Sequence, residues 1–120
     1  MDKPVRVLVC GSRDWTDRAA IYRELSKLPA GSVVLHGGAD GADYLAGEVA
    51  EELGFDVVVY RANWITEGKS AGIKRNRRML FDGCPDLVYA FHAKIRESSG
   101  TRDMVNLAAA TDAVIRIFER

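Results

Sequence analysis

A glycine-rich turn is the clearest sign of chemistry in the sequence. Gly37, Gly38 and Gly41 come directly after an apolar run that ends at His36. Because the turn opens a predicted helix, its backbone N–H groups lie at the positive end of a helix dipole, where phosphate binds. The turn is neither the GxGxxG dinucleotide fingerprint nor a P-loop, which also needs a lysine and a hydroxyl residue. It predicts a phosphate site of another kind.

Two acidic residues, Asp40 and Asp43, belong to the same turn. Either carboxylate can cap the helix that follows. A carboxylate that faces a phosphate would repel it, so the functional alternative is a hydrogen bond to a ribose hydroxyl or to a base. The sequence leaves both roles open.

A second short turn, Gly11-Ser12-Arg13, follows another apolar run. Glycine allows a close backbone approach, serine offers a hydroxyl, and arginine can form paired hydrogen bonds with phosphate or carboxylate. An ordinary turn with an exposed arginine is the alternative. Ser98-Ser99-Gly100-Thr101 has a similar composition and precedes a predicted helix. Its residues either cap that helix or bring a second helix N-terminus, with Gly100 and Thr101, to the same crevice.

The basic run 74–78 is the strongest charge cluster. On a helix, Arg75 shares a face with Arg78 and Met79. One arginine can therefore reach a crevice while Lys74 and Arg77 stay in water, and we expect Arg75 to contact the ligand.

Other reactive side chains give weaker signals. Trp64 can stack on a base or simply pack. His36 and His92 have no partner at metal-ligand spacing, so we expect no metal and no resident cofactor. The two cysteines, Cys10 and Cys84, are expected to be reduced, buried thiols.

The elements that position these residues alternate between strands and helices. Apolar runs predict strands at 5–10, 32–36, 55–60, 86–91 and 113–118. Helical spacing predicts a helix capped by Thr16, one with the inward stripe Ala46, Val49, Ala50 and Leu53, a basic one over 73–81 and one over 101–110. Residues 61–72 are expected to form a long loop.

This alternation predicts an α/β fold: a single domain over 1–120, with a Rossmann-like, doubly wound parallel sheet of about five strands and helices on both faces. In such sheets, ligands bind beyond the carboxyl ends of the strands, at the point where strand order reverses. The functional segments should therefore be 11–16, 37–43, 61–72 and 92–101.

Composition narrows the class of partner. The chain has 17 basic and 17 acidic residues, so its net charge gives no general attraction to nucleic acid or to an anionic membrane. The apolar run 5–10 is too short for a signal peptide or a membrane-spanning helix. We expect a cytoplasmic protein with no membrane partner.

Taken in order, these segments resemble the SLOG superfamily, and above all its small stand-alone members related to YspA. The matching residues are 9–14, 36–43, Trp64, 71–72, Arg75, Asn76, Met79, 85–86, Gly100 and Thr101. The resemblance implies a Rossmann-like fold and a nucleotide-type ligand, such as a nucleoside phosphate, NAD or ADP-ribose derivative. It also adds Asn76 to the expected site, and it makes a homodimer or higher homo-oligomer an expectation that no residue pattern here decides.

Two kinds of relative imply different functions. LOG-type phosphoribohydrolases use a PGGxGT turn followed by a glutamate, and Met104 holds the position of that glutamate here. A glycosidase needs a carboxylate, and Asp103 should point about 100° away from Met104 on a helix. An enzyme would have to find its base in Asp14, Asp40, Asp43 or Glu67. DprA-type proteins bind single-stranded DNA and share the Arg75-Asn76-Arg77 segment, but the neutral net charge disfavours a long DNA track. Ligand binding or sensing ranks first, a nucleotide N-glycosidase second and DNA binding third.

Overall fold

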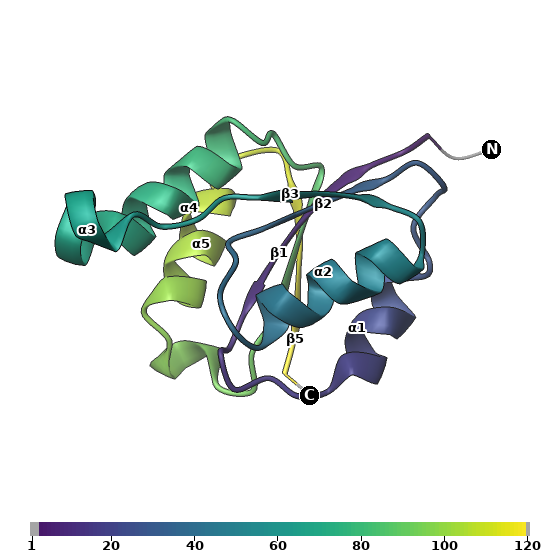
Figure 1. Ribbon diagram of the computed structural model, residues 1–120, viewed down its shortest axis with the longest axis horizontal. Coiled ribbons are helices and arrows are strands. Elements are labelled where there is room, and N and C mark those ends of the chain that lie inside the picture. The colour runs from purple at the N-terminus through teal and green to yellow at the C-terminus, as the bar shows by residue number, and fades with distance from the viewer. Residues whose placement is uncertain (1–2, 120) are drawn as a thin grey trace.

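Five parallel strands form the centre of the molecule (Figure 1). The computed structural model describes residues 3–119. Its strands are β1 (Arg6–Gly11), β2 (Val33–His36), β3 (Asp56–Val59), β4 (Leu87–Phe91) and β5 (Val114–Phe118). They pair in the order β3-β2-β1-β4-β5. The predicted α/β fold with a doubly wound sheet is confirmed, and strand order reverses between β1 and β4.

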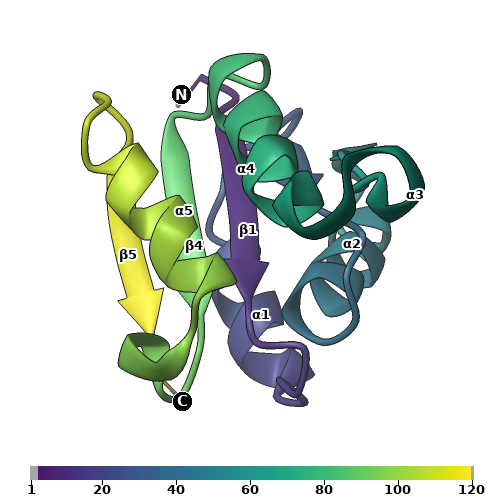
Figure 2. The same ribbon diagram turned by 90° about the vertical axis from the view of Figure 1, so that its left-hand side faces the viewer.

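Helices cover both faces of the sheet. The helices α1 (Arg18–Leu25) and α2 (Ala42–Glu52) pack on one face, and α4 (Ala71–Phe81) and α5 (Gly100–Ala108) on the other. Figure 2 shows α4 and α5 in front of the sheet, while the short helix α3 (Trp64–Glu67) projects beside them. None of the helices formed by residues 3–119 is long and apolar enough to cross a membrane.

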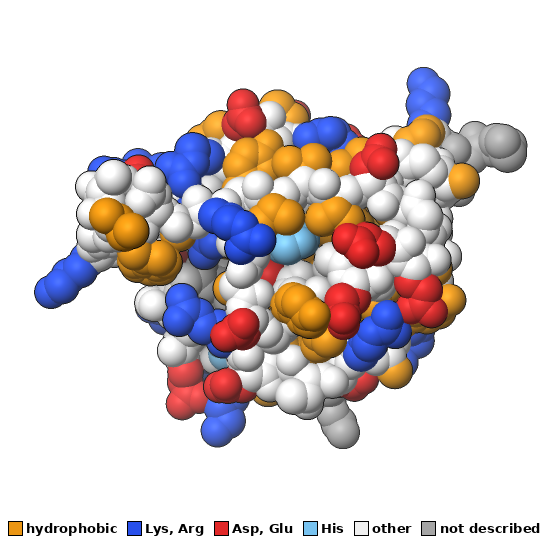
Figure 3. Space-filling view, viewed as in Figure 1, with side chains coloured by type: hydrophobic (Ala, Val, Ile, Leu, Met, Phe, Trp, Pro, Cys, Tyr) orange, Lys and Arg blue, Asp and Glu red, His pale blue; other side chains and the backbone are white. Residues whose placement is uncertain are grey.

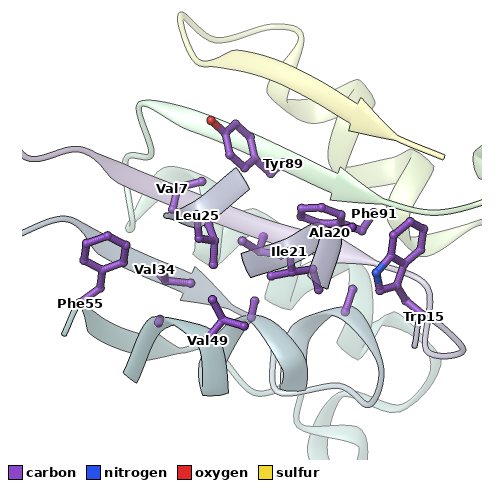
Figure 4. Packing of buried hydrophobic residues seen from close by; sticks show 14 residues of the cluster. Val7, Trp15, Ala20, Ile21, Leu25, Val34, Val49, Phe55, Tyr89 and Phe91 are labelled. Carbon is purple, nitrogen blue, oxygen red and sulfur yellow. The ribbon is translucent and has the colours of Figure 1, made fainter. Parts of the chain in front are cut away.

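The alternation of side chains along β1 explains why two helical layers are needed. Val7 and Val9 are fully buried against α1 and α2, whereas Leu8 and Cys10 point into the layer of α4 and α5. A central parallel strand is buried on both faces, so it reads as a continuous apolar run. Figure 4 shows the first of these two cores, with Trp15 and Phe91 at the end nearest the carboxyl edge of the sheet.

The start of α1 differs from the prediction by one residue. Asp17, not Thr16, caps the helix, because its Oδ1 accepts a hydrogen bond of 3.0 Å from the N–H of Ala20. The buried Trp15 contributes to this arrangement, since its indole N–H donates to the carbonyl of Asp17 at 2.9 Å. The cap is therefore set by the anchoring of a core aromatic residue as well as by local sequence.

Two further expectations were wrong. Residues 61–72 are not a long loop: Asn63 caps α3 by accepting from the N–H of Thr66 at 3.2 Å, a 3₁₀ turn spans Gly68–Ser70, and α4 already begins at Ala71. Of the two thiols expected to be buried, only Cys10 is buried. Cys84 is exposed because it lies in the turn between α4 and β4, with a positive φ of 46°.

Candidate functional site

A pocket of about 630 Å³ opens at the carboxyl ends of β1 and β4, where strand order reverses. This is the location that the doubly wound fold predicts. The walls come from the segments after β1, β2 and β4, from the region of α3 and α4, and from the start of α5. The residues that line it are Cys10, Gly11, Ser12, Arg13, Asp14, Ala39, Asp43, Trp64, Lys69, Gly72, Ile73, Arg75, Asn76, Met79, His92, Ser98, Ser99, Gly100, Thr101 and Asp103.

A smaller pocket of about 360 Å³ adjoins the first. It lies over the turn that follows β2 and over the residues that follow β3. Arg13, Ala39, Trp64 and Arg75 line both pockets. The smaller pocket is completed by Gly37, Gly38, Asp40, Arg61 and Ala62.

The structure brings together nearly all of the residues predicted for the site. The larger pocket contains Gly11, Ser12, Arg13, Asp43, Trp64, Arg75, Asn76, Gly100 and Thr101. Gly37, Gly38 and Asp40 line the smaller one. Gly41 lines neither, and instead a Cβ at this position would overlap the backbone of Ser12 and Arg13. Gly41 thus lets the two glycine-containing turns pack against each other.

The turn after β1 is held in place by backbone hydrogen bonds. The N–H of Ser12 donates to the carbonyl of Phe91 at 2.9 Å, and the carbonyl of Ser12 accepts from the N–H of Ala42 at 3.0 Å. The hydroxyl oxygen of Ser12 accepts from the N–H of Asp14 at 3.0 Å. Its O–H hydrogen remains available to donate to a ligand. These bonds fix the segment that carries Arg13 to the end of β4 and to the start of α2.

Side chains of the protein already accept hydrogen bonds from three backbone N–H groups of the glycine-rich turn. The N–H groups of Gly37 and Ala39 donate to Oδ2 of Asp43 at 3.0 and 3.3 Å, and the N–H of Gly38 donates to Nδ1 of His36 at 3.0 Å. A carboxylate of the protein itself therefore takes the place at which the sequence suggested a phosphate. Asp43 is buried, which raises its pKa to about 6 even though the turn and nearby arginines favour the charged form.

His36 is neutral at physiological pH. Burial and the charges of Arg61 and Arg75 lower the pKa of His36 to about 4. Its Nδ1 accepts a hydrogen bond from the turn, so the proton of the neutral ring belongs on Nε2. Both His36 and Asp43 thus serve to shape the glycine-rich turn.

Arg75 crosses from α4 to the turn after β2. One guanidinium nitrogen, Nη1, donates to the carbonyl of Gly37 at 2.7 Å, and Nε donates to Oδ1 of Asn76 at 3.1 Å. Burial lowers the pKa of Arg75 from its usual value, while the nearby carboxyl of Asp43 opposes this shift. Lys74 and Arg77 are exposed and line neither pocket, as helical spacing predicted.

Asn76 connects α4 to the start of α5. Its Nδ2 group donates to the carbonyl of Gly100 at 3.2 Å and to Oδ2 of Asp103 at 3.1 Å. Asn76 is buried, so these bonds replace the water it would otherwise bind. The residue both lines the pocket and orients Asp103.

Asp103 is the site residue that sequence reasoning placed wrongly. Met104 is fully buried in the core between the sheet, α4 and α5. The rotation of about 100° per residue therefore turns Asp103 into the pocket instead of away from it. Just before α5, the Oγ of Ser98 accepts a hydrogen bond from the N–H of Thr101 at 2.9 Å. The contact of Met104 with the core is what the spacing alone did not reveal.

Arg61 and Lys69 were also missed, because the sequence was expected to form a loop there. Both flank α3, whose first residue, Trp64, is 52% exposed and lines both pockets. The helix cap at Asn63, followed three residues later by Thr66, is the sequence signal that would have located α3. Among residues 3–119, no three His, Cys, Asp or Glu side chains come close enough to hold a metal ion.

Comparison with known proteins agrees with the fold and with the two glycine-containing turns. The YspA, cpYpsA-related SLOG family matches residues 5–66, just over half of the chain. The chain belongs to this SLOG family. The matched segment includes both turns and Trp64, whereas Arg75 and Asp103 lie beyond it.

One relative matches over most of its length. The Gene 61 protein of Mycobacterium phage D29 is 42% identical over 106 residues, which cover 81% of this chain and 82% of that protein. No solved structure matches the chain significantly.

Proposed function

We propose that this SLOG-family protein binds a nucleotide or a nucleotide derivative at the carboxyl ends of its strands. The observation that carries the proposal is the pocket of about 630 Å³ at the strand-order reversal, lined by residues from four separate segments. Its volume is in the range of small-molecule sites, and its position is that of nucleotide sites in doubly wound folds.

The polar side chains suit the parts of a nucleotide. Arg13 and Arg75 can form forked hydrogen bonds with phosphate oxygens, and Trp64 presents an exposed ring face on which a base can stack. Asp14 and Asp103 can accept hydrogen bonds from ribose hydroxyls. Asp43 is less suited to that role because it already accepts two backbone hydrogen bonds.

A second candidate function is hydrolysis of the N-glycosidic bond. The specific observation in its favour is that Asp103 faces the pocket and is oriented by Asn76. A carboxylate at this position can assist an attacking water or stabilise an oxocarbenium-like transition state. Asp103 would then substitute for the glutamate whose position is taken by Met104.

A thermal-shift screen tests the first function and leads directly to the second. The purified protein is mixed with nucleoside mono-, di- and triphosphates, NAD and ADP-ribose, and each mixture is then analysed for free base. A shift with intact ligand supports binding or sensing. Release of base that disappears in Asp103→Asn supports the glycosidase. The absence of any shift contradicts the proposed nucleotide site and directs the search to single-stranded DNA or a protein partner.

A further inference from the structure

The two adjoining pockets differ in charge. The larger pocket is lined by three cationic side chains, Arg13, Lys69 and Arg75, and by three aspartates. The smaller pocket is lined by three arginines but by a single carboxylate, that of Asp40. Positive charge is therefore in excess only on the side of the smaller pocket.

Acidic groups balance the arginines of the smaller pocket only in part: the buried carboxyl of Asp43 attracts Arg75 and Arg13. Over residues 3–119, neither Arg13 nor Arg61 nor Arg75 forms a salt bridge. By contrast, Arg78, one turn along α4 from Arg75, is paired with Glu67. His36 adds no charge beside them, because it is neutral. An anion that enters the smaller pocket would therefore meet guanidinium groups whose charge Asp43 offsets only in part.

Arg61 is placed over the glycine-rich turn by the chain that leaves β3. The N–H of Tyr60 donates to the carbonyl of His36 at 2.8 Å, and the carbonyl of Arg61 accepts from Nη2 of Arg78 at 3.2 Å. A Cβ built on Gly38 would lie 2.8 Å from Nη1 of Arg61. The glycine therefore makes room for the guanidinium, which lies against the wall of the smaller pocket.

The face of the molecule seen in Figure 3 shows no comparable concentration of positive charge. Figure 3 shows basic and acidic side chains mixed over the face seen in Figure 1, with hydrophobic side chains at the protruding α3. An extended nucleic-acid track would need a continuous basic surface on that face. The local excess of arginine instead suits a compact anion.

From this arrangement we infer that the smaller pocket holds a second phosphate of the same ligand, and that Arg61 determines the preference for a diphosphate. This inference rests on the proposed nucleotide site. The nucleoside and first phosphate occupy the larger pocket, the phosphates pass between Arg13 and Arg75, and the second phosphate reaches Arg61. The shared lining residues make this path continuous, and the guanidinium fork matches phosphate oxygens.

The experiment measures the dissociation constants of AMP and ADP by titration calorimetry for the native protein, Arg61→Ala and Arg77→Ala. Arg77 is the matched control, because it is exposed and lines neither pocket. We expect the native protein to prefer ADP about tenfold. A charge-assisted hydrogen bond from an exposed arginine accounts for about a three- to tenfold effect. Arg61→Ala should therefore remove most of this preference and leave AMP affinity unchanged, while Arg77→Ala retains it.

The outcomes separate this inference from the proposed function. Equal loss of AMP and ADP affinity in Arg61→Ala, or a native preference for AMP, would overturn the role of Arg61 while the nucleotide site stands. If neither adenine nucleotide binds, inorganic pyrophosphate becomes the probe: saturable binding that Arg61→Ala abolishes supports the inference, and no binding refutes it. A comparison of ADP-ribose with ADP then distinguishes a bridging diphosphate from a terminal one. Arg61→Lys, which keeps the charge but not the fork, should give a preference for ADP over AMP between those of the native protein and Arg61→Ala.

Discussion

Replacing Asp43 with asparagine should stabilise the protein at neutral pH and should do so progressively less as the pH is lowered. The carboxyl of Asp43 is buried, and it accepts hydrogen bonds from the N–H groups of Gly37 and Ala39. The amide oxygen of asparagine can accept the same two bonds without a buried negative charge. The substitution therefore isolates the electrostatic cost of the aspartate from the hydrogen bonds that shape the turn.

The magnitude follows from the pKa of Asp43, which burial raises from 3.8 to about 6. Such a change corresponds to about 3 kcal/mol, at about 1.4 kcal/mol for each tenfold change in proton affinity. Between pH 3.8 and about 6 the folded state holds the proton more tightly than the unfolded state does. Protonation of this carboxyl therefore contributes stability below pH 3.8 that is lost as the pH rises to about 6, and the contribution is constant above that.

Urea unfolding of the native protein and Asp43→Asn at a series of pH values from about 4 to 8 measures the effect. The difference in unfolding free energy, variant minus native, should grow by about 2.5 kcal/mol across this range, with little further change above about pH 7. Asp40→Asn is the matched control, since it removes an exposed carboxylate from the same turn. A difference that stays constant with pH, or a variant that is less stable at pH 8, would refute the reasoning. The second result would mean that the attraction between the Asp43 carboxylate and Arg75 outweighs the cost of burying that carboxylate.

Three further predictions concern the turns and the pocket. Gly41→Ala should cost about 2 kcal/mol more in urea unfolding than Gly54→Ala, because both glycines have a positive φ but only at Gly41 would a Cβ overlap another backbone segment; equal losses would show that the turns can move apart. Arg75→Ala should abolish binding of the ligand found in the thermal-shift screen, yet cost only about 2 kcal/mol of stability for the lost bonds to Gly37 and Asn76; unchanged affinity in calorimetry would remove Arg75 from the site. Trp64→Phe should eliminate the fluorescence change on ligand binding, because the remaining Trp15 is only 7% exposed; a persisting change would assign it to Trp15.

Much of the fold could be predicted because its signals are local. The β1 run is apolar on both faces, and this feature alone indicates a central parallel strand. The glycine-containing turns mark the carboxyl edge, and helical spacing correctly separated Arg75 from Lys74 and Arg77. Each of these inferences uses residues that are neighbours in sequence.

The errors arose where distant contacts decide the outcome. The pocket-facing direction of Asp103 depends on the packing of Met104 against α4 and the sheet. The occupancy of the glycine-rich turn depends on Asp43 folding back from the first turn of α2. Its spacing from Gly37 is consistent with this contact, but the same spacing also fits a simple helix cap. Arg61 and Lys69 escaped notice because a four-residue helix gives too short a pattern to distinguish from a loop.

The contrast between the two thiols makes the native chain convenient to label. Cys10 is buried, and burial raises the pKa of its thiol, so it reacts slowly with alkylating reagents. Cys84 is exposed just before β4, at the amino ends of the strands, while both pockets lie at the opposite edge of the sheet. A maleimide fluorophore or a biotin tether can therefore be attached at one position without an engineered cysteine. In the absence of reductant, the same residue will be the point of covalent cross-linking between molecules.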